Sequence, residues 1–321
     1  MFANPFMLLT DYVYGSVNVD ENVIIDLLNS KTVQRLKHIS QQGLPKILLD
    51  NQTYFTRYEH SIGVFILVRK LGGELEEQIA GLLHDVSHMA FSHTMDMIFG
   101  DYSTQNFQDS IHAQFLSNSD AGQVLRNYGF DPEKISDLSR FPLVDLEIPN
   151  LCADRADHLY REIILRGEEA NWDKIINHNG YMAFYDESDA LEFANKYLEM
   201  QRKVWGNWEE TARRYIFAGI IKQALDSGIL STEDLFATEE QVMDKVMGIE
   251  EFKEKIQLLN RKIRVEDNGE VKLRIKKRYV DPLVVTNGTV KRLSELNNDF
   301  AEALERFKRE PYERNVKIFF E

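Results

Sequence analysis

Residues 81–93 of the chain read GLLHDVSHMAFSH and bring three histidines and one aspartate together within thirteen residues. Six of the eight histidines of the chain lie between residues 60 and 158. The stretch begins like an ordinary apolar helix and ends among titratable side chains. Imidazole and carboxylate groups together bind divalent cations and leave positions open for water. The pattern therefore indicates a metal site at the point where this helix ends.

Two adjacent residues of the stretch, His84 and Asp85, are the first candidate ligands. Neighbours on an ideal helix point about 100° apart, so both bind one metal only if the helix loosens there. His60, at the start of one predicted helix, and Asp154, at the start of another, can complete the set because packed helices bring their ends together. Spacing alone leaves open the alternative that each histidine is an ordinary surface or core side chain.

Three strings carry a family resemblance: RYEHSIGV, GLLHDVSHMAFSH and ADRADHLYRE. They resemble the H…HD…D signature of the HD-domain phosphohydrolases. The longer patterns R-x-E-H-S-x-G and H-D-x-x-H-x-x-F-S-H-x-x-D resemble the branch with bacterial dGTPases and the SAM-and-HD-domain deoxynucleotide triphosphohydrolase. The resemblance covers residues 11–165 and extends more weakly through KKRYVDPLV. It implies a mainly α fold, an HD-domain helical bundle.

The resemblance also implies a reaction, the hydrolysis of a deoxynucleoside triphosphate to a deoxynucleoside and tripolyphosphate. One divalent metal, with Mn, Fe, Mg, Zn and Ni all open, would be held by His60, His84, Asp85 and Asp154. The implied catalytic residues beside the phosphates are His88, His112 and Asp96. The implied substrate contacts are Gln41, Arg57, His93, Arg155, His158 and Glu162.

Several positions depart from the pattern of that branch. His158 replaces a tyrosine, Glu162 replaces an aspartate and Arg155 replaces a lysine, while Ala113 stands where an acidic residue is usual. The departures do not affect the four implied metal ligands. They leave open which base the substrate carries and how many phosphates it has. The segment MQRKVWGNW is a further candidate to bring Arg202 or Trp208 to the sugar or base, or simply to bury an aromatic residue at a helix end.

Other interpretations of single residues stay open. Arg57 beside Glu59 can form a surface ion pair, Asp96 can cap a following helix, and His112 can lie on a solvated helix face. Two other functions compete with the implied one. They are another HD phosphohydrolase activity, on nucleoside monophosphates or signalling nucleotides, and a catalytically weak nucleotide-binding regulator.

The elements that must position these residues are mostly helical. Helices are expected over residues 59–71 and 74–88 and in a long segment after Pro149, and residues 44–57 are expected to be extended with a turn at 51–52. The chain divides into a helical catalytic domain, residues 1–260 with its ligands within 57–165, and a small α+β subdomain, residues 261–321. The basic stretch 261–279 predicts a β-hairpin that turns at Asn268-Gly269.

This basic stretch holds eight Lys and Arg against three Asp and Glu. It is interpreted as an edge hairpin kept soluble by its charges, with binding to an acidic neighbouring subunit or to a nucleotide as the alternative.

The whole chain has the opposite charge, with a formal net charge of −14 over 321 residues. Such a charge disfavours general binding to nucleic acids or anionic membranes. No apolar run approaches the length of a membrane span. The single cysteine, Cys152, excludes an internal disulfide and fits a buried position in a cytoplasmic protein. We expect a cytoplasmic homo-oligomer, dimer or tetramer, with a nucleotide as its partner.

Overall fold

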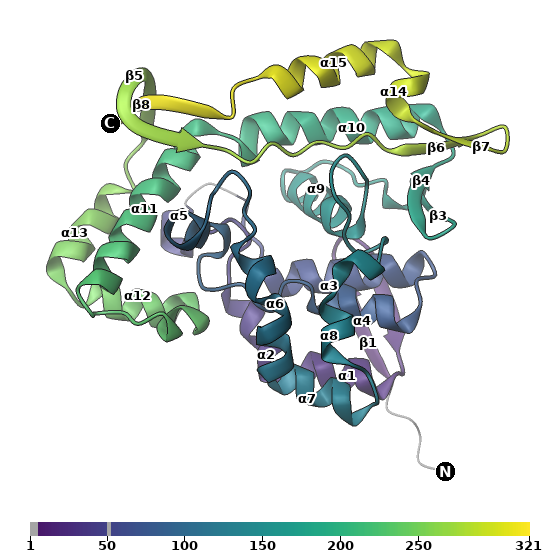
Figure 1. Cartoon of the computed structure of the whole chain (residues 1–321), viewed down its shortest axis with the longest axis horizontal. Helices are drawn as coiled ribbons and strands as arrows, with labels where there is room; N and C mark the ends of the chain where they lie inside the picture. Colours follow the sequence, from purple (N-terminus) through teal and green to yellow (C-terminus); the bar gives the residue numbers. More distant parts are fainter. Residues whose placement is uncertain (1–5, 50–52) are drawn as a thin grey trace.

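Three helices form the centre of the fold: α3 (Arg57–Lys70) packs against both α4 (Leu75–Leu83) and α9 (Ala153–Leu165) (Figure 1). The computed structural model describes residues 6–49 and 53–321. Helix α3 begins with a capping box, in which the Thr56 hydroxyl accepts from the backbone of Glu59 and the Glu59 carboxylate accepts from the backbone of Thr56. The helix ends before Gly72, whose φ of 75° suits a residue without a side chain.

The described residues form fifteen α-helices and eight strands, so the prediction of a mainly α fold is confirmed. The remaining helices are α1 (Asn22–Asn29), α2 (Lys31–Arg35), α5 (Asp96–Phe99), α6 (Phe107–Asn118), α7 (Asp120–Asn127), α8 (Pro132–Ser136), α10 (Glu187–Met200), α11 (Trp208–Asp226), α12 (Glu239–Met247), α13 (Glu250–Leu258), α14 (Leu293–Leu296) and α15 (Asn298–Arg309). No helix in the described ranges is long and apolar enough to cross a membrane.

The strands form three small sheets. They are β1 (Met7–Asp11), β2 (Gly15–Val19), β3 (Ile175–His178), β4 (Tyr181–Phe184), β5 (Ile263–Arg274), β6 (Leu283–Thr286), β7 (Thr289–Arg292) and β8 (Glu313–Phe320). Strands β1 and β2 pair, β5 pairs with β8, and the third sheet has the order β3-β4-β6-β7. In that sheet β6 pairs parallel with β4, and α15 packs along α10 (Figure 1). The division at residue 260 stays a prediction, but backbone pairing crosses it.

The predicted hairpin at Asn268-Gly269 is wrong. Strand β5 runs through this dipeptide and pairs antiparallel with β8, with a shift of register between Asp267 and Val271. A Cβ on Gly269 would lie 1.9 Å from the carbonyl carbon of Val316, so only glycine fits against β8 at this point. The dipeptide forms a β-bulge instead of a turn because β8 supplies the pairing partner for both halves of the stretch.

The expectation of an extended segment over residues 44–57 is also wrong in part. Residues 46–48 form a 3₁₀ turn, and the pairing in this region is one antiparallel bridge between Ser40 and Thr56. The predicted turn at residues 51–52 lies outside the described residues.

Two hydrophobic cores meet at the stretch with the clustered histidines. Leu82, Leu83 and Val86 belong to the core built around α1, α3, α4, α9 and α10. Met89 and Phe91, a few residues later, belong to the core formed by α11, α12, α13, β5 and β8. Between the cores the chain leaves the helix, and Phe91 adopts a φ of 66°. The histidines therefore lie at the junction of the two cores.

Candidate metal centre and adjoining cavity

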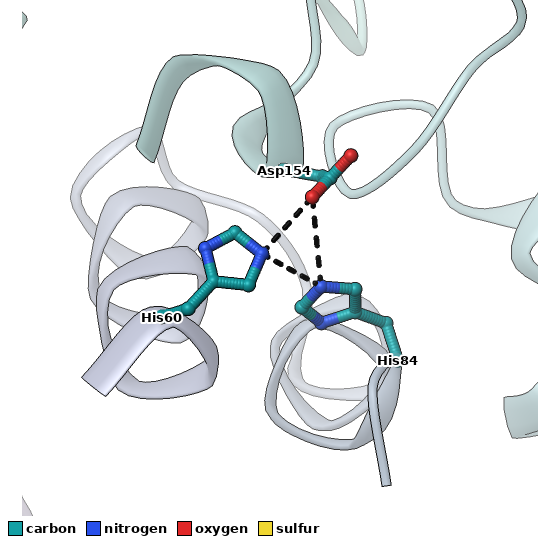
Figure 2. A group of neighbouring side chains, drawn as sticks. All are labelled: His60, His84 and Asp154. Carbon is teal, nitrogen blue, oxygen red and sulfur yellow. Dashed lines mark hydrogen bonds and ion pairs between the residues drawn. The ribbon is translucent and has the colours of Figure 1, made fainter. Parts of the chain in front are cut away.

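Three of the four predicted metal ligands converge on one point (Figure 2). His60 lies in the first turn of α3, His84 directly follows the last residue of α4, and Asp154 lies in the first turn of α9. His60 Nε2 lies 3.0 Å from Asp154 Oδ1 and 3.2 Å from His84 Nε2, and His84 Nε2 lies 3.8 Å from Asp154 Oδ1. The three helix ends thus bring two imidazoles and a carboxylate together.

Hydrogen bonds fix which ring nitrogen faces that point. Nδ1 of His84 lies 2.8 Å from the carbonyl oxygen of Gly81, and Nδ1 of His60 lies 2.6 Å from Asp157 Oδ2. Each Nδ1 therefore carries the hydrogen and donates it, which leaves the Nε2 lone pair directed at the centre. Two lone pairs and a carboxylate oxygen in such proximity repel one another unless a proton or a metal cation lies between them. The donor set fits a divalent metal with nitrogen and oxygen ligands.

Asp85, the fourth predicted ligand, borders this centre from the side of α4. Its carboxylate oxygens lie 3.6 Å from His84 Nε2 and 3.8 Å from His60 Nε2. The same carboxylate accepts a hydrogen bond from Arg57 Nη1 at 2.5 Å and lies 3.3 Å from His88 Nε2. Burial raises the pKa of Asp85, but Arg57 and the imidazoles outweigh it and hold this pKa well below its usual range. Asp85 is therefore an anion that links the centre to Arg57 and His88.

A buried charge network behind the centre was not predicted. Asp157 accepts from His60 on one side, and Arg161 Nη2 donates to Asp157 Oδ1 at 2.7 Å on the other. Arg161 also lies 2.9 Å from Asp11 Oδ2, and Asp157 and Arg161 are fully buried. A carboxylate behind a metal-binding imidazole orients the ring and raises its basicity. The spacing Asp154–Asp157–Arg161, one helical turn at each step, was the available signal in the sequence.

A cavity of about 850 Å³ adjoins the centre. Ten of the predicted site residues line it: Gln41, Arg57, His84, Asp85, His88, His93, Asp154, Arg155, His158 and Glu162. His60, Asp96 and His112 are not among the described side chains that line it. These three are nonetheless buried close to residues that do.

The predicted catalytic residues form two groups. His93 Nδ1 lies 3.1 Å from Asp96 Oδ2, and the rings of His88 and His93 lie 4.8 Å apart, edge to face. Asp96 also accepts from the backbone of Phe107, the first residue of α6, and so bonds a free N–H group of that helix, while its catalytic role stays a prediction. Burial raises the pKa of Asp96 to about 6 and, with the Arg57 guanidinium, lowers the pKa of His88 to about 3.

His112 lies apart from this pair. Its Nδ1 is 2.9 Å from the hydroxyl of Ser87, and the side chain is buried, so the solvated-face interpretation is wrong. Burial lowers the pKa of His112 to about 4. His112 contacts the loop that carries His88 and does not reach the cavity surface.

The predicted phosphate-binding arginines already have protein partners. Arg57 is buried and paired with Asp85, while Glu59 caps α3, so these two do not form a surface pair. Arg155 Nη1 lies 2.9 Å from the sulfur of Cys152 and 3.5 Å from Asp145 Oδ1. Cys152 is buried, as expected.

The tryptophan that lines the cavity is Trp205. It ends a π-helical turn, residues 201–205, and stacks on His158 with ring centroids 4.7 Å apart. Its buried indole Nε1 has no hydrogen-bond partner among residues 6–49 and 53–321. Arg202 instead pairs with Glu310 at the surface, and Trp208 packs beneath Arg314, so the expectation for both is wrong. Glu162, one of the implied substrate contacts, accepts from Arg166 at 2.7 Å.

Glu239 ties the second core to this site and was also not predicted. Its Oε1 accepts from the backbone N–H groups of Ser40, at 2.9 Å, and Phe91, at 3.2 Å. Ser92 in turn donates to the Ser40 carbonyl and accepts from Arg57 Nε. Burial raises the pKa of Glu239 to about 8. Helix α12 thereby holds the two loops that position Arg57.

Comparison with known proteins agrees with this geometry. The sequence profile of the HD domain matches residues 57–162. The chain is 37% identical to the uncharacterized protein YdhJ of Bacillus subtilis over 246 residues, 74% of each chain. It is 32% identical to the metal-dependent phosphohydrolase cns2 of Cordyceps militaris over 71% of this chain and 68% of that protein.

Two more distant similarities complete the comparison. The deoxynucleoside triphosphate triphosphohydrolase SAMHD1 of Danio rerio is 31% identical over 112 residues, 30% of this chain and 18% of that protein. The fold is similar to that of a phosphohydrolase from Bacteroides thetaiotaomicron, with a TM-score of 0.70, 16% identity and coverage of 97% of this chain and 99% of that one.

Proposed function

The chain belongs to the HD-domain family of metal-dependent phosphohydrolases, and from this premise we propose that it hydrolyses deoxynucleoside triphosphates to deoxynucleosides and tripolyphosphate. The observation that carries the proposal is the position of the metal-binding cluster. It borders a cavity of about 850 Å³ into which Arg57, His88 and His93 also project. Cavities of this size accommodate ligands as large as a nucleotide.

A divalent metal held by His60, His84, Asp85 and Asp154 would polarise a phosphate oxygen and lower the pKa of a bound water. Arg57 keeps one nitrogen, Nη2, without a protein partner among the described residues, and this nitrogen can donate to a phosphate oxygen. His93 is held by Asp96 and is therefore the imidazole best placed to give a proton to the leaving 5′-oxygen. Burial, with His88 and Arg57, lowers the pKa of His93 well below its usual range, and the negative charge of a bound phosphate chain would oppose this shift.

The nucleoside would lie on the other side of the cavity, against His158 and Trp205. The amide of Gln41 lines the same cavity, and its Oε1 lacks a hydrogen-bond partner within the described part of the chain. The similarity to a protein named as a deoxynucleoside triphosphate triphosphohydrolase supports the choice of substrate, although it covers only 30% of this chain.

A second activity, hydrolysis of nucleoside monophosphates, is favoured by one observation. Arg155 and Glu162, which the resemblance assigns to phosphate and sugar, are both engaged by protein groups. A nucleoside monophosphate, which is smaller than a triphosphate, would need neither Arg155 nor Glu162.

Product analysis tests the proposal. The purified protein is incubated with Mn²⁺ and, separately, each dNTP, NTP and dNMP, and the products are resolved by ion-exchange chromatography. Deoxynucleoside with tripolyphosphate supports the proposal. Orthophosphate from monophosphates alone supports the second activity, and nucleotide binding without turnover for any divalent metal refutes both.

A further inference from the structure

Two cations from the C-terminal part of the chain enter the cavity beside the candidate metal centre. Lys276 and Arg278, in the extended segment that follows β5, line the same cavity as His88 and His93. Lys277 between them points the opposite way and donates to the carbonyl oxygen of Lys308 at 2.6 Å. Alternate residues of an extended segment face opposite sides, so the segment presents the two cations to the cavity together.

The backbone of this segment is fixed by hydrogen bonds. Gln201, in the π-helical turn, donates to the carbonyl oxygen of Lys276 at 2.9 Å. The backbone N–H of Ile275 donates to the carbonyl oxygen of Tyr312 at 2.9 Å. Arg278 Nη2 donates to Gln105 Oε1. The positions of the two cations are therefore determined by the fold.

Neither cation has a carboxylate partner. Among residues 6–49 and 53–321, no carboxylate oxygen lies within 4.0 Å of the side-chain nitrogens of Lys276 or Arg278. The carboxylates of Asp109 and Asp154 attract Lys276 electrostatically, but only from beyond that distance. Burial together with the charge of Arg278 lowers the pKa of Lys276 to about 8. A half-buried cation without a counterion destabilises the folded chain, so this arrangement indicates a ligand that supplies the negative charge.

Two other arginines of the cavity, Arg57 and Arg155, already lie near carboxylates. Arg57 pairs with Asp85 at 2.5 Å, and Arg155 lies 3.5 Å from Asp145. Arg278 donates to Gln105, two residues before Phe107, whose backbone N–H donates to Asp96, the partner of His93. These contacts bring the segment with the two cations near the imidazole that would protonate the leaving oxygen.

We infer that Lys276 and Arg278 form the subsite for the terminal phosphates of the substrate's phosphate chain. The inference rests on the proposed function, in which the leaving group is a chain of three phosphates. Arginine donates to phosphate through two nitrogens at once, whereas lysine acts as a compact charge, and the two together match neighbouring phosphate groups. This subsite would favour a triphosphate over a monophosphate.

Binding of inorganic tripolyphosphate and of orthophosphate to the metal-loaded protein, by calorimetry, tests the subsite. We expect Lys276→Met and Arg278→Met each to weaken tripolyphosphate binding at least tenfold and orthophosphate binding by less than threefold. Lys276→Arg should retain most of the affinity. Lys272→Met is the matched control, because Lys272 lies in β5 just before this segment, is exposed and pairs with Glu313.

Urea unfolding of the same variants separates binding from structure. Since Lys276 has no counterion, Lys276→Met should unfold at the native urea midpoint or above it, whereas loss of a structural cation lowers the midpoint. Unchanged tripolyphosphate binding in both Met variants overturns the inference, as does a tenfold loss in Lys272→Met. Steady-state kinetics separates the two proposals. Turnover of dNTPs with a native KM in both Met variants refutes the subsite and retains the function. Absence of dNTP turnover in the native chain, together with weakened tripolyphosphate binding in both Met variants, refutes only the function.

Discussion

Gly63 in α3 is the point where helix α9 brings its buried ion pair closest to the backbone of a neighbouring helix. A Cβ added at Gly63 would lie 1.8 Å from Asp157 Oδ1 and 2.1 Å from Arg161 Nη2. Both distances are far below van der Waals contact, and both atoms belong to fully buried side chains. In Gly63→Ala either the ion pair or α9 itself has to move.

The size of the effect follows from two opposing contributions. Replacing glycine by alanine inside a helix stabilises a protein by about 0.5–1 kcal/mol where nothing is in the way. Breaking a buried ion pair costs about 3–5 kcal/mol because the charges lose their partners but stay desolvated. The net loss in the free energy of unfolding is therefore about 2–4 kcal/mol. Because Asp157 also holds Nδ1 of His60, metal affinity should fall by about 10–100-fold.

Urea unfolding and a Mn²⁺ titration measure the two effects. The matched control is Gly219→Ala in α11, where an added Cβ has no atom within 4 Å. The free energy of unfolding of this variant should rise by about 0.5–1 kcal/mol, and the variant should bind Mn²⁺ as the native chain does. If Gly63→Ala unfolds at the native urea concentration and binds Mn²⁺ with native affinity, α9 does not approach α3 as described, and the network behind His60 has no role in metal binding.

Three further predictions concern the centre, the loop anchor and the nucleoside side. Asp154→Asn should reduce metal content and hydrolysis by at least about 100-fold with little change in the urea midpoint, since Asp154 is partly exposed; native metal content would contradict the assignment. Burial raises the pKa of Glu239 to about 8, so the folded chain still holds a proton that the unfolded chain releases near pH 4.5. The free energy of unfolding should therefore fall by up to about 1.4 kcal/mol per pH unit as the pH rises from about 5 to 8. Glu239→Gln should remove that dependence, and an equal slope in both proteins in urea unfolding would refute it. Trp205→Phe should raise KM for dNTPs about 3–10-fold by removing the indole donor, without changing tripolyphosphate affinity, and an unchanged KM would exclude that donor from recognition.

The centre itself was accessible from the sequence because its ligands lie at helix ends. Gly72 ends α3 as expected, whereas α4 ends at Leu83 and not at the expected residue 88, because the chain leaves the helix where the two cores meet. The network behind the centre was not predicted, because its spacing alone is a weak signal. Asp157 and Arg161 look like ordinary charges on an amphipathic helix, and only the crossing of α9 over α3 turns them inward.

The C-terminal region was harder to predict because long-range pairing overrides a local signal. Asn-Gly favours a hairpin turn when the two flanking segments are each other's only partner. Here β8, more than forty residues away, pairs with both segments and leaves the dipeptide as a bulge. The same pairing places the segment 275–278 beside the cavity, and Lys276 and Arg278 face it, so the surplus of positive charge in 261–279 is shared between the protein surface and the cavity.

The junction of the two hydrophobic cores has a consequence for how the protein loses activity. The candidate metal ligands belong to helices of the first core or directly follow them, whereas Glu239 fixes the loops around Arg57 from the second. If the second core loosens first on heating, the chain keeps its metal and loses catalysis. Metal content therefore reports only on the first core, and inactivation reports on the integrity of both.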